Sequence, residues 1–363
     1  MCLSIFTFLL LLTTISLKVE SRLETVIVIH RHGDRTPTSS FPNDPYSDDS
    51  YWEDGWGQLT KQGKRRMFSV GEYLRERYDG FLTNNPREVE AQSSEKPRVV
   101  ESLLSILAGL YPPKGRWIWN KDLSWQPIAI AVREAKVDGF LTASTCPNLN
   151  NEMSRIYNST EMKQLVNKHE RLVKQVEQYA GVSTPHDAKE AMSGMRIQRQ
   201  LGHPQPDWFT DDVEDEMKDF HGHFFDLESK TKTTQKLKAG LIFKEIITIL
   251  NKKKDIYKNK KIFFLSTHDT KLAAILNALQ VFNKLPPPFG SAMLIELHSA
   301  SNSHFVKSFY LNETYSEKPV PLSYPFCNHR KVCELETFVN YIEKYSLKDW
   351  EKECGLELKN KSR

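Results

Sequence analysis

The sequence has little net charge, few cysteines and no internal repeat, and each shortage narrows the classes of protein to which it can belong. Its 363 residues carry a formal charge of +4 and no long basic run interleaved with aromatic side chains, so we expect no nucleic-acid partner. None of the five cysteines forms a Cys-x-x-Cys pair, which argues against a zinc site. The remaining composition is ordinary for a globular protein of one large or two smaller domains.

Only one long apolar run is present, at residues 3–17, and it is too short for a comfortable membrane span. Such a run at the start of a chain is typical of a signal peptide, which we expect to comprise residues 1–21. A buried first strand is the alternative interpretation, but a better strand pattern follows at once. With no second run of spanning length, we expect no membrane anchor and a protein that is secreted or delivered to the lysosomal lumen.

Four cysteines remain if Cys2 is removed with the signal peptide, and an even number in an exported chain suggests two disulfides. Cys327 and Cys333 are near enough to close a small loop, which would leave Cys146 and Cys354 as a long-range pair. Four cysteines allow three pairings, and the sequence does not decide between them. Candidate glycosylation sites on the same route are the sequons at Asn158, Asn312 and Asn360.

Strand and helix patterns alternate at both ends of the chain. The β-branched run at 25–29 predicts a buried parallel strand, and 262–265 predicts a second one. Further elements of this alternation are helices after Thr60, after Pro97 and at 272–279, and strands at 292–297 and 305–311. This alternation predicts an α/β core formed by residues 22–133 and 255–363.

The intervening stretch 134–254 differs from the core in its pattern. Apolar residues recur at helical spacing over 162–176 and again over 237–250, and strand signals between them are sparse. We therefore expect a mostly helical cap inserted into the core.

The most informative motif follows the first predicted strand and reads Arg31-His32-Gly33-Asp34-Arg35-Thr36-Pro37. The carboxyl end of a parallel strand is where α/β sheets bind ligands. Two guanidinium groups converging there suit a tetrahedral dianion, because each offers rigid paired donors. Nearby cations also lower the pKa of a histidine, which keeps a lone pair available for attack on phosphorus. A basic surface turn with a capping Asp is the alternative, and the convergence of residue types disfavours it.

Arg-His-Gly-x-Arg-x-Pro is the signature of the histidine acid phosphatases, and the sequence resembles their prostatic, lysosomal and venom type. Similar segments recur at Gly57-Gln58-Leu59-Thr60, Gly71-Glu72-Tyr73-Leu74, Leu110-Tyr111-Pro112-Pro113 and Trp125-Gln126-Pro127. The resemblance spans nearly all of the mature chain and is weakest in the helical insertion. It implies a phosphoglycerate-mutase-like α/β core, with a mostly parallel central sheet flanked by helices and a helical cap.

The resemblance also implies the roles of individual residues. His32 would accept the phosphoryl group, and Asp269 would begin protonated and give its proton to the leaving alcohol. The phosphate oxygens would be held by Arg31, Arg35, Arg98 and His268. The family usually has Arg where this chain has Gln92, and often Asp where it has Pro97, so these two positions put the local geometry of Arg98 in question.

No cofactor and no metal are expected, because the arginines can neutralise the charge of the phosphate. The run His221-Gly222-His223, with Asp219 and Asp226, suggests a metal site only weakly, and a cap helix or surface loop is the preferred interpretation. Expected substrates are small phosphomonoesters or phosphoproteins. The resemblance further implies a homodimer with Trp125 near the contact.

Three hypotheses of function follow from these patterns. The first is an acid phosphatase. The second keeps the fold and changes the substrate, as in phytases and phosphoglycerate mutases, of which the latter are usually intracellular. The third is a secreted binding protein on a phosphatase scaffold, which the complete set of candidate site residues disfavours.

Overall fold

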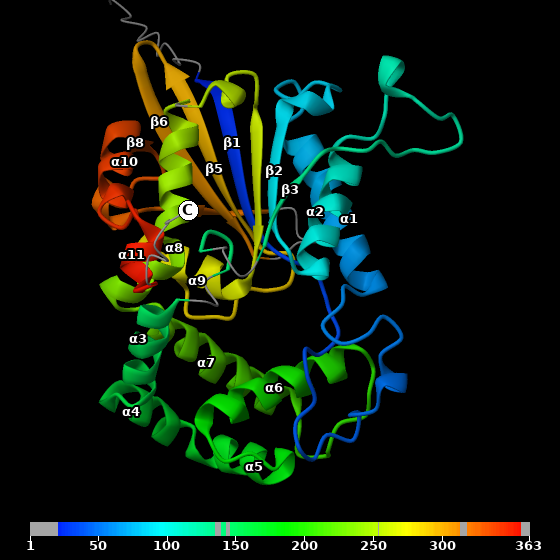
Figure 1. The fold of residues 1–363 in the computed structure, drawn as a ribbon, viewed down its shortest axis with the longest axis vertical. Helices are drawn as coiled ribbons and strands as arrows, with labels where there is room; N and C mark the ends of the chain where they lie inside the picture. Colours follow the sequence, from blue (N-terminus) through cyan, green and yellow to red (C-terminus); the bar gives the residue numbers. More distant parts are fainter. Residues whose placement is uncertain (1–20, 135–138, 143–145, 253, 313–317, 357–363) are drawn as a thin grey trace, which may run out of the picture.

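The computed structural model describes residues 21–134, 139–142, 146–252, 254–312 and 318–356. The predicted signal peptide and the sequon at Asn360 lie outside these residues. A twisted sheet stands between two layers of helices, and a separate group of helices lies beyond one end of the sheet (Figure 1).

Within the described residues the sheet has eight strands in the order β3-β2-β4-β1-β5-β6-β7, with β8 also paired to β6. Their bounds are β1 (Arg22–Arg31), β2 (Val89–Ser94), β3 (Ala131–Arg133), β4 (Ile262–Thr267), β5 (Ala292–Ala300), β6 (Ser303–Leu311), β7 (Val320–Leu322) and β8 (Cys333–Glu334). The α/β class is thus confirmed. Only the half from β3 to β1 is parallel, because β5 and β6 form a hairpin that runs antiparallel to β1.

Strand β1 shows why the β-branched run forms the centre of the sheet. Val26 and Val28 point into one apolar cluster, Ile27 and Ile29 point into another, and none of the four is exposed to solvent. Since side chains of a strand alternate between faces, a run without polar residues fits only a strand that is covered on both sides.

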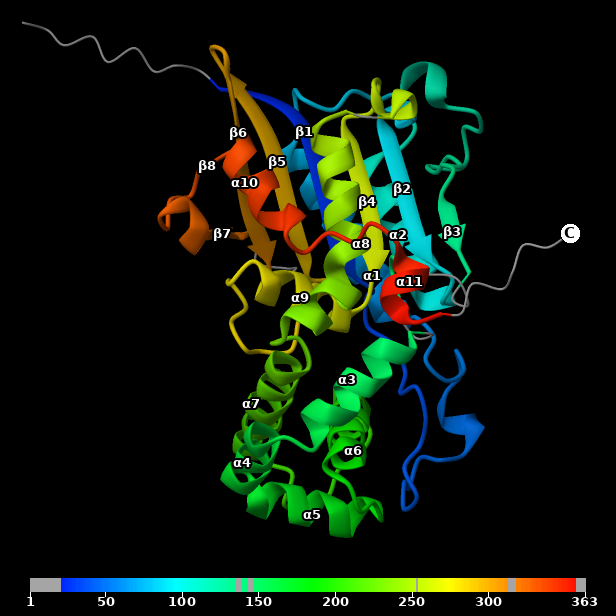
Figure 2. The same ribbon diagram turned by 60° about the vertical axis from the view of Figure 1, so that its left-hand side comes forward.

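Five helices provide most of this cover (Figure 2). One face packs against α1 (Lys61–Arg77) and α2 (Pro97–Leu110), and the other against α8 (Lys232–Leu250), α9 (Asp269–Ala278) and α10 (Leu335–Glu343). The hydroxyl of Thr60 accepts the N–H of Gly63 and caps α1, as the sequence predicts.

The separate group of helices encloses its own apolar cluster. It comprises α3 (Pro147–Tyr157), α4 (Thr160–Lys168), α5 (Glu170–Ala180), α6 (Pro185–Gln200) and α7 (Asp211–Glu228). The single helix expected over 162–176 is wrong, because the chain breaks at His169, which ends α4 and begins α5. The buried imidazole of His169 lies 3.1 Å from Glu216 on α7, and this contact accompanies the change of direction.

Two disulfides join Cys146 to Cys354 and Cys327 to Cys333, which confirms the pairing that loop size favoured. The first connects the start of α3 to α11 (Trp350–Cys354) across 208 residues of sequence. In the chain-entropy model, closing so long a loop stabilises the folded state by about 5 kcal/mol. None of the described helices combines the length and apolar composition needed to cross a membrane.

Candidate active site

Neighbouring parallel strands bring the two predicted histidines together. Arg31 at the end of β1 lies opposite Thr267 at the end of β4, so His32 and His268 leave the sheet side by side. Their ring centroids are 5.7 Å apart. The sheet topology therefore unites residues that are more than two hundred positions apart in the sequence.

Gly33 lets the chain turn beside α1, although its backbone conformation is an ordinary one. A Cβ atom at this position would lie 2.8 Å from the carbonyl oxygen of Gly63 and from the side chain of Met67. Gly63 faces the same contact, since its own Cβ would lie 2.2 Å from the oxygen of Asp34. The glycine of the motif is thus required by close backbone packing against α1.

His32 is held in one tautomer. Its Nδ1 lies 2.8 Å from the carbonyl oxygen of Gly33, to which it can only donate, so Nε2 carries the lone pair. That Nε2 lies 3.2 Å from the Nε–H of Arg98. Burial and the charge of Arg31 hold the pKa of His32 well below its usual value, so the ring stays neutral in mild acid.

The guanidinium groups of Arg31, Arg35 and Arg98 lie near His32, and their positive charges help to lower its pKa. The guanidinium of Arg31 donates to the carbonyl of Pro287 at 2.6 Å and lies 4.1 Å from the ring centroid of Phe289. Burial, followed by the charges of Arg31 and Arg98, lowers the pKa of Arg35 to about 9. The Nε atoms of Arg31 and Arg35 are buried without a hydrogen-bond partner. Unpaired buried donors are costly, so the cluster is built to receive an anion.

Asp269 is the first residue of α9 and lies against the same cluster. One carboxylate oxygen is 2.7 Å from Arg31, and the other accepts the N–H of Thr270 at 2.8 Å. Burial opposes ionisation, but the neighbouring arginines outweigh it and hold the pKa of Asp269 below its usual range. The carboxyl beside these arginines is therefore ionised, which differs from the expectation that Asp269 begins protonated.

His268 caps the same helix and completes the cluster. Its Nε2 lies 3.2 Å from the hydroxyl of Ser94, at the end of β2. Burial and the charge of Arg98 lower the pKa of His268 to about 3. All six candidate residues thus converge at one end of the parallel strands.

The two departures from the family pattern leave this geometry intact. Gln92 turns toward Arg133 and Glu245, with its amide oxygen 2.9 Å from the guanidinium of Arg133. Pro97 occupies the first turn of α2, where its missing N–H costs nothing, and Arg98 follows it directly into the site.

Several supporting residues lie outside the predicted set. The hydroxyl of Ser102 accepts the N–H of Gly33 at 3.0 Å and donates to the carbonyl of Arg98, which links the motif to α2. Asp34 is buried and binds Arg66 through both oxygens, at 2.6 and 3.1 Å. An Asp within a basic motif is a signal for such a partner, but no pattern in the sequence distinguishes Arg66 from the other arginines of α1.

The His-Gly-His run does not gather ligands within the described residues, where no group of three His, Cys, Asp or Glu side chains has metal-binding geometry. His221 and His223 lie on α7. His223 bonds to the backbone of Asp219, whereas His221 is buried with its ring stacked on Phe225.

A neutral histidine whose Nε2 lone pair faces an arginine, at the carboxyl ends of parallel strands, is the arrangement expected of an enzyme that transfers phosphoryl groups. Residues 22–311 match the model of the histidine phosphatase superfamily (branch 2), and the chain belongs to this family. Within it the chain is an acid phosphatase, a phosphomonoesterase, as its relatives are.

The chain is 32% identical to prostatic acid phosphatase of Rattus norvegicus over 344 residues, which cover 92% of this chain and 89% of that one. It is 30% identical to lysosomal acid phosphatase of Xenopus laevis, with 95% and 82% coverage. The resemblance drawn from the motif is therefore confirmed.

Among solved structures, the phytase of Citrobacter braakii shares the fold with a TM-score of 0.69 and 19% identity, over 92% of this chain and 99% of that one. Hafnia alvei phytase is similar at 0.67 and 17%, with 92% and 98% coverage. At these identities the likeness concerns the fold alone.

Proposed function

We propose that the protein is a secreted acid phosphatase that works through a phosphohistidine on His32, with Asp269 as the proton donor. The observation that carries this proposal is the orientation of His32. Its Nε2 lone pair faces the three arginines, while its Nδ1–H is fixed by the carbonyl of Gly33.

In the first step, the Nε2 lone pair forms a bond to phosphorus and the P–O bond to the alcohol breaks. The guanidinium groups of Arg31, Arg35 and Arg98 stabilise the charge that spreads over the phosphoryl oxygens in the transition state. The departing oxygen takes a proton from Asp269 and leaves as the neutral alcohol.

The ionised resting state of Asp269 determines where that proton comes from. A phosphate monoester loses its second proton near pH 6, so in mild acid it reaches the site as a monoanion. We infer that the ester brings the proton, which passes to Asp269 as Arg31 turns from the carboxylate to the phosphate. The acid optimum then reflects the protonation of the substrate.

In the second step, a water oxygen attacks phosphorus as the N–P bond breaks and His32 regains its lone pair. Asp269, now ionised, takes a proton from the water and passes it to the phosphate product, which leaves as the dihydrogen phosphate monoanion and restores the carboxylate. The enzyme returns to its starting state with every proton accounted for.

The proposed location rests on three features of the chain. It has two disulfides, which form in oxidising compartments, an exposed sequon at Asn158 and the signal-like run at 3–17. Secretion and delivery to the lysosomal lumen both agree with these features. Expression in a eukaryotic secretory host tests this, since export with loss of residues 1–21 is expected and retention of an unprocessed chain contradicts it.

We also infer a homodimer. Strand β3 is at the edge of the sheet and its three residues are exposed, and a row of exposed apolar side chains precedes it. This row includes Ile118, Trp119, Leu123 and Trp125. An unpaired edge beside apolar surface is suited to pairing with a second copy. Sedimentation of the wild type and of Trp119→Ser tests this, with a monomeric wild type as the contrary outcome.

The enzymatic proposal is tested by assaying the mature chain with an aryl phosphate from pH 3 to pH 9, beside His32→Ala. Wild type is then mixed with ³²P-labelled substrate and stopped in alkali, where phosphohistidine survives. Turnover and label that both vanish in His32→Ala support the mechanism. Turnover that persists in this variant would overturn it.

A further inference from the structure

A cavity of about 660 Å³ adjoins the phosphate-binding cluster. Arg31 and Asp269 line the cavity on the side of the sheet. Arg196 of α6 and His221 of α7 line it on the side of the separate group of helices. The loop at 285–289 forms a further wall. In the proposed mechanism this is space beside the ester, where the leaving group can lie.

His221 is a buried polar group that the phosphate chemistry does not use. It is only 8% exposed, and its Nδ1 is buried without a hydrogen-bond partner. Burial and the charges of Lys189 and Arg196 keep the pKa of His221 well below its usual value, so the ring offers a neutral donor and acceptor. A group of this kind is costly to bury unless something in the cavity pairs with it.

Arg196 is the second such group. Its Nε is buried without a hydrogen-bond partner, and its nearest carboxylate oxygen, on Glu214, is 3.7 Å away. Burial lowers the pKa of Arg196, the charge of Glu214 partly opposes this, and the charge of Arg31 lowers the pKa further, so the two guanidinium groups share one electrostatic environment. A guanidinium has five N–H donors, and the ion pair of this one among the described residues is the long contact with Glu214.

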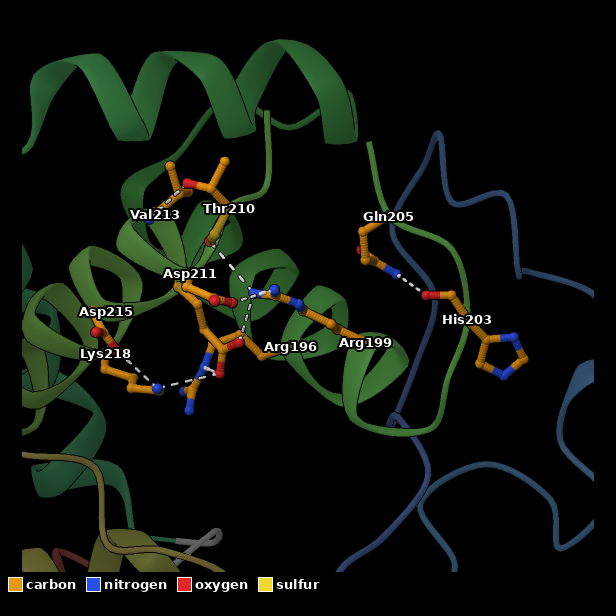
Figure 3. Close-up of polar contacts among 10 residues, drawn as sticks. Arg196, Arg199, His203, Gln205, Thr210, Asp211, Val213, Asp215 and Lys218 are labelled. Atoms are coloured by element: carbon orange, nitrogen blue, oxygen red, sulfur yellow. Dashed lines mark hydrogen bonds and ion pairs between the residues drawn. The ribbon is translucent and has the colours of Figure 1, made fainter. Parts of the chain in front are cut away.

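The neighbouring cations make shorter ion pairs than the 3.7 Å contact of Arg196 with Glu214. Arg199 lies 2.9 Å from Glu214 and also contacts Asp211, and Lys218 lies 2.9 Å from Asp215 (Figure 3). Asp211 and Asp215 are mostly exposed, so these pairs lie toward solvent. Among these three cations, Arg196 therefore has the longest ion pair, and it lines the cavity.

We propose that Arg196 and His221 form a second anion-binding subsite, which recognises an acidic group on the leaving portion of the substrate. The subsite rests on the proposed function, since it presumes that the reacting phosphate lies among Arg31, Arg35 and Arg98. Its ligand is a second phosphate or a carboxylate that is separated from the reacting ester by a short spacer. The enzyme then prefers doubly anionic monoesters to neutral ones.

The test compares matched phosphonates, which resemble the ester and are not hydrolysed. Calorimetry at pH 5 measures the Kd of alkylphosphonates, of phosphonocarboxylates and of alkane bisphosphonates with three- to five-carbon spacers. We expect the best bisphosphonate to bind wild type at least about tenfold more tightly than the alkylphosphonate of equal length, as charge-assisted hydrogen bonds imply. An equal gain for the carboxylate identifies a general anion site, and a gain confined to the bisphosphonate identifies a phosphate site.

Arg196→Gln should bring this ratio of affinities to within about twofold of one. Arg155→Gln, the same change at an exposed arginine of α3, should keep it. Glu214→Gln should raise the ratio, because it removes the carboxylate that competes with the ligand for Arg196. The ratio compares two ligands on one protein, so a general loss of folded protein cancels.

A ratio near one in wild type would overturn the subsite, as would a high ratio that survives Arg196→Gln. The outcome is separable from that of the proposed function, which is judged by hydrolysis of phenyl phosphate. If phenyl phosphate is not hydrolysed while the bisphosphonate preference follows Arg196, the subsite stands and the catalytic proposal fails.

Discussion

The Nε–H of Arg98 points at the Nε2 of His32, with 3.2 Å between the two nitrogens, so the proposed nucleophilic lone pair accepts a hydrogen bond from Arg98. Incoming phosphate must draw this N–H away before phosphorus can reach the nitrogen. The second nitrogen of Arg98 stays tied to the carbonyl of Gly57 at 3.2 Å, which limits how far the guanidinium can swing. In the proposed mechanism Arg98 therefore moves its N–H from the lone pair of His32 to a phosphoryl oxygen.

Arg98→Lys should lower kcat for an aryl phosphate by about 10²- to 10³-fold, the usual cost of removing a transition-state donor. A lysine cannot hold both Gly57 and phosphate, because it lacks the planar fork of arginine. Steady-state kinetics measures the change, with Arg87→Lys on the surface as the control. A loss of less than tenfold would contradict the role given to Arg98.

Asp269→Asn should slow the hydrolysis of an alkyl phosphate by about 10²-fold or more and that of 4-nitrophenyl phosphate far less, because nitrophenolate leaves without a proton. For the wild type, kcat/KM should fall as pH rises through about 6, where the ester loses the proton it brings. Asp255→Asn, at an exposed carboxylate, is the control. Equal slowing of both substrates would count against proton donation.

Gly63→Ala should destabilise the protein and abolish activity, because the new methyl group would meet the carbonyl oxygen of Asp34 at 2.2 Å and push α1 away from the motif. Gly194→Ala is the matched change on α6, where the methyl group finds only Phe41 at 3.8 Å. There we expect a gain of about 0.5–1 kcal/mol from the better helix propensity of alanine. Thermal unfolding of both variants checks the contrast, and similar Tm values would refute it.

The buried imidazole of His30 should make the folded protein less stable in acid. Burial lowers its pKa in the folded protein to about 4, from an unfolded value near 6.5. The unfolded chain therefore binds a proton first as pH falls, and stability declines from about pH 6.5 down to pH 4. By pH 4.5 this one group should cost roughly 2–3 kcal/mol.

His30→Asn keeps a donor near the carbonyl of Arg31 and removes the titration. We expect it to be less stable than wild type at pH 7.5 but to lose less stability on going to pH 4.5. Urea unfolding at the two pH values measures the difference, and His186→Asn, at a half-exposed site, is the control. Parallel losses in wild type and His30→Asn would show that this histidine does not carry the effect.

The elements that sequence patterns predicted are those whose evidence is local. The motif of His32 is contiguous, and the β1 run is apolar throughout because both of its faces are covered. Strand β2 was not predicted, because Val89–Ser94 is short and half polar. Its place in the sheet depends on pairing with β4. The break between α4 and α5 at His169 accompanies a contact with α7. A contact between distant segments does not show in the spacing of apolar residues along the sequence.

The residues of the candidate site also divide into those with local evidence in the sequence and those that only the fold brings together. Residue types and spacing predicted His32, Arg31 and Arg35, and the family pattern added Arg98, His268 and Asp269. Neither indicated the hydroxyl of Ser94 beside His268, because only the sheet brings these residues together. The ionised state of Asp269 also could not be predicted, since it depends on the balance between burial and the charges of arginines placed by the fold.

The bond between Cys146 and Cys354 determines what a protease cut would do to this molecule. A cut within the separate group of helices, at any point of the chain from the end of α3 to the start of α7, would leave His32 and Arg98 on one fragment. His268 and Asp269 would be on the other. Because Cys146 lies on the first fragment and Cys354 on the second, the two pieces stay covalently joined and cannot dilute apart. A nicked chain can therefore retain a complete site, and would separate into two bands on a gel only after reduction.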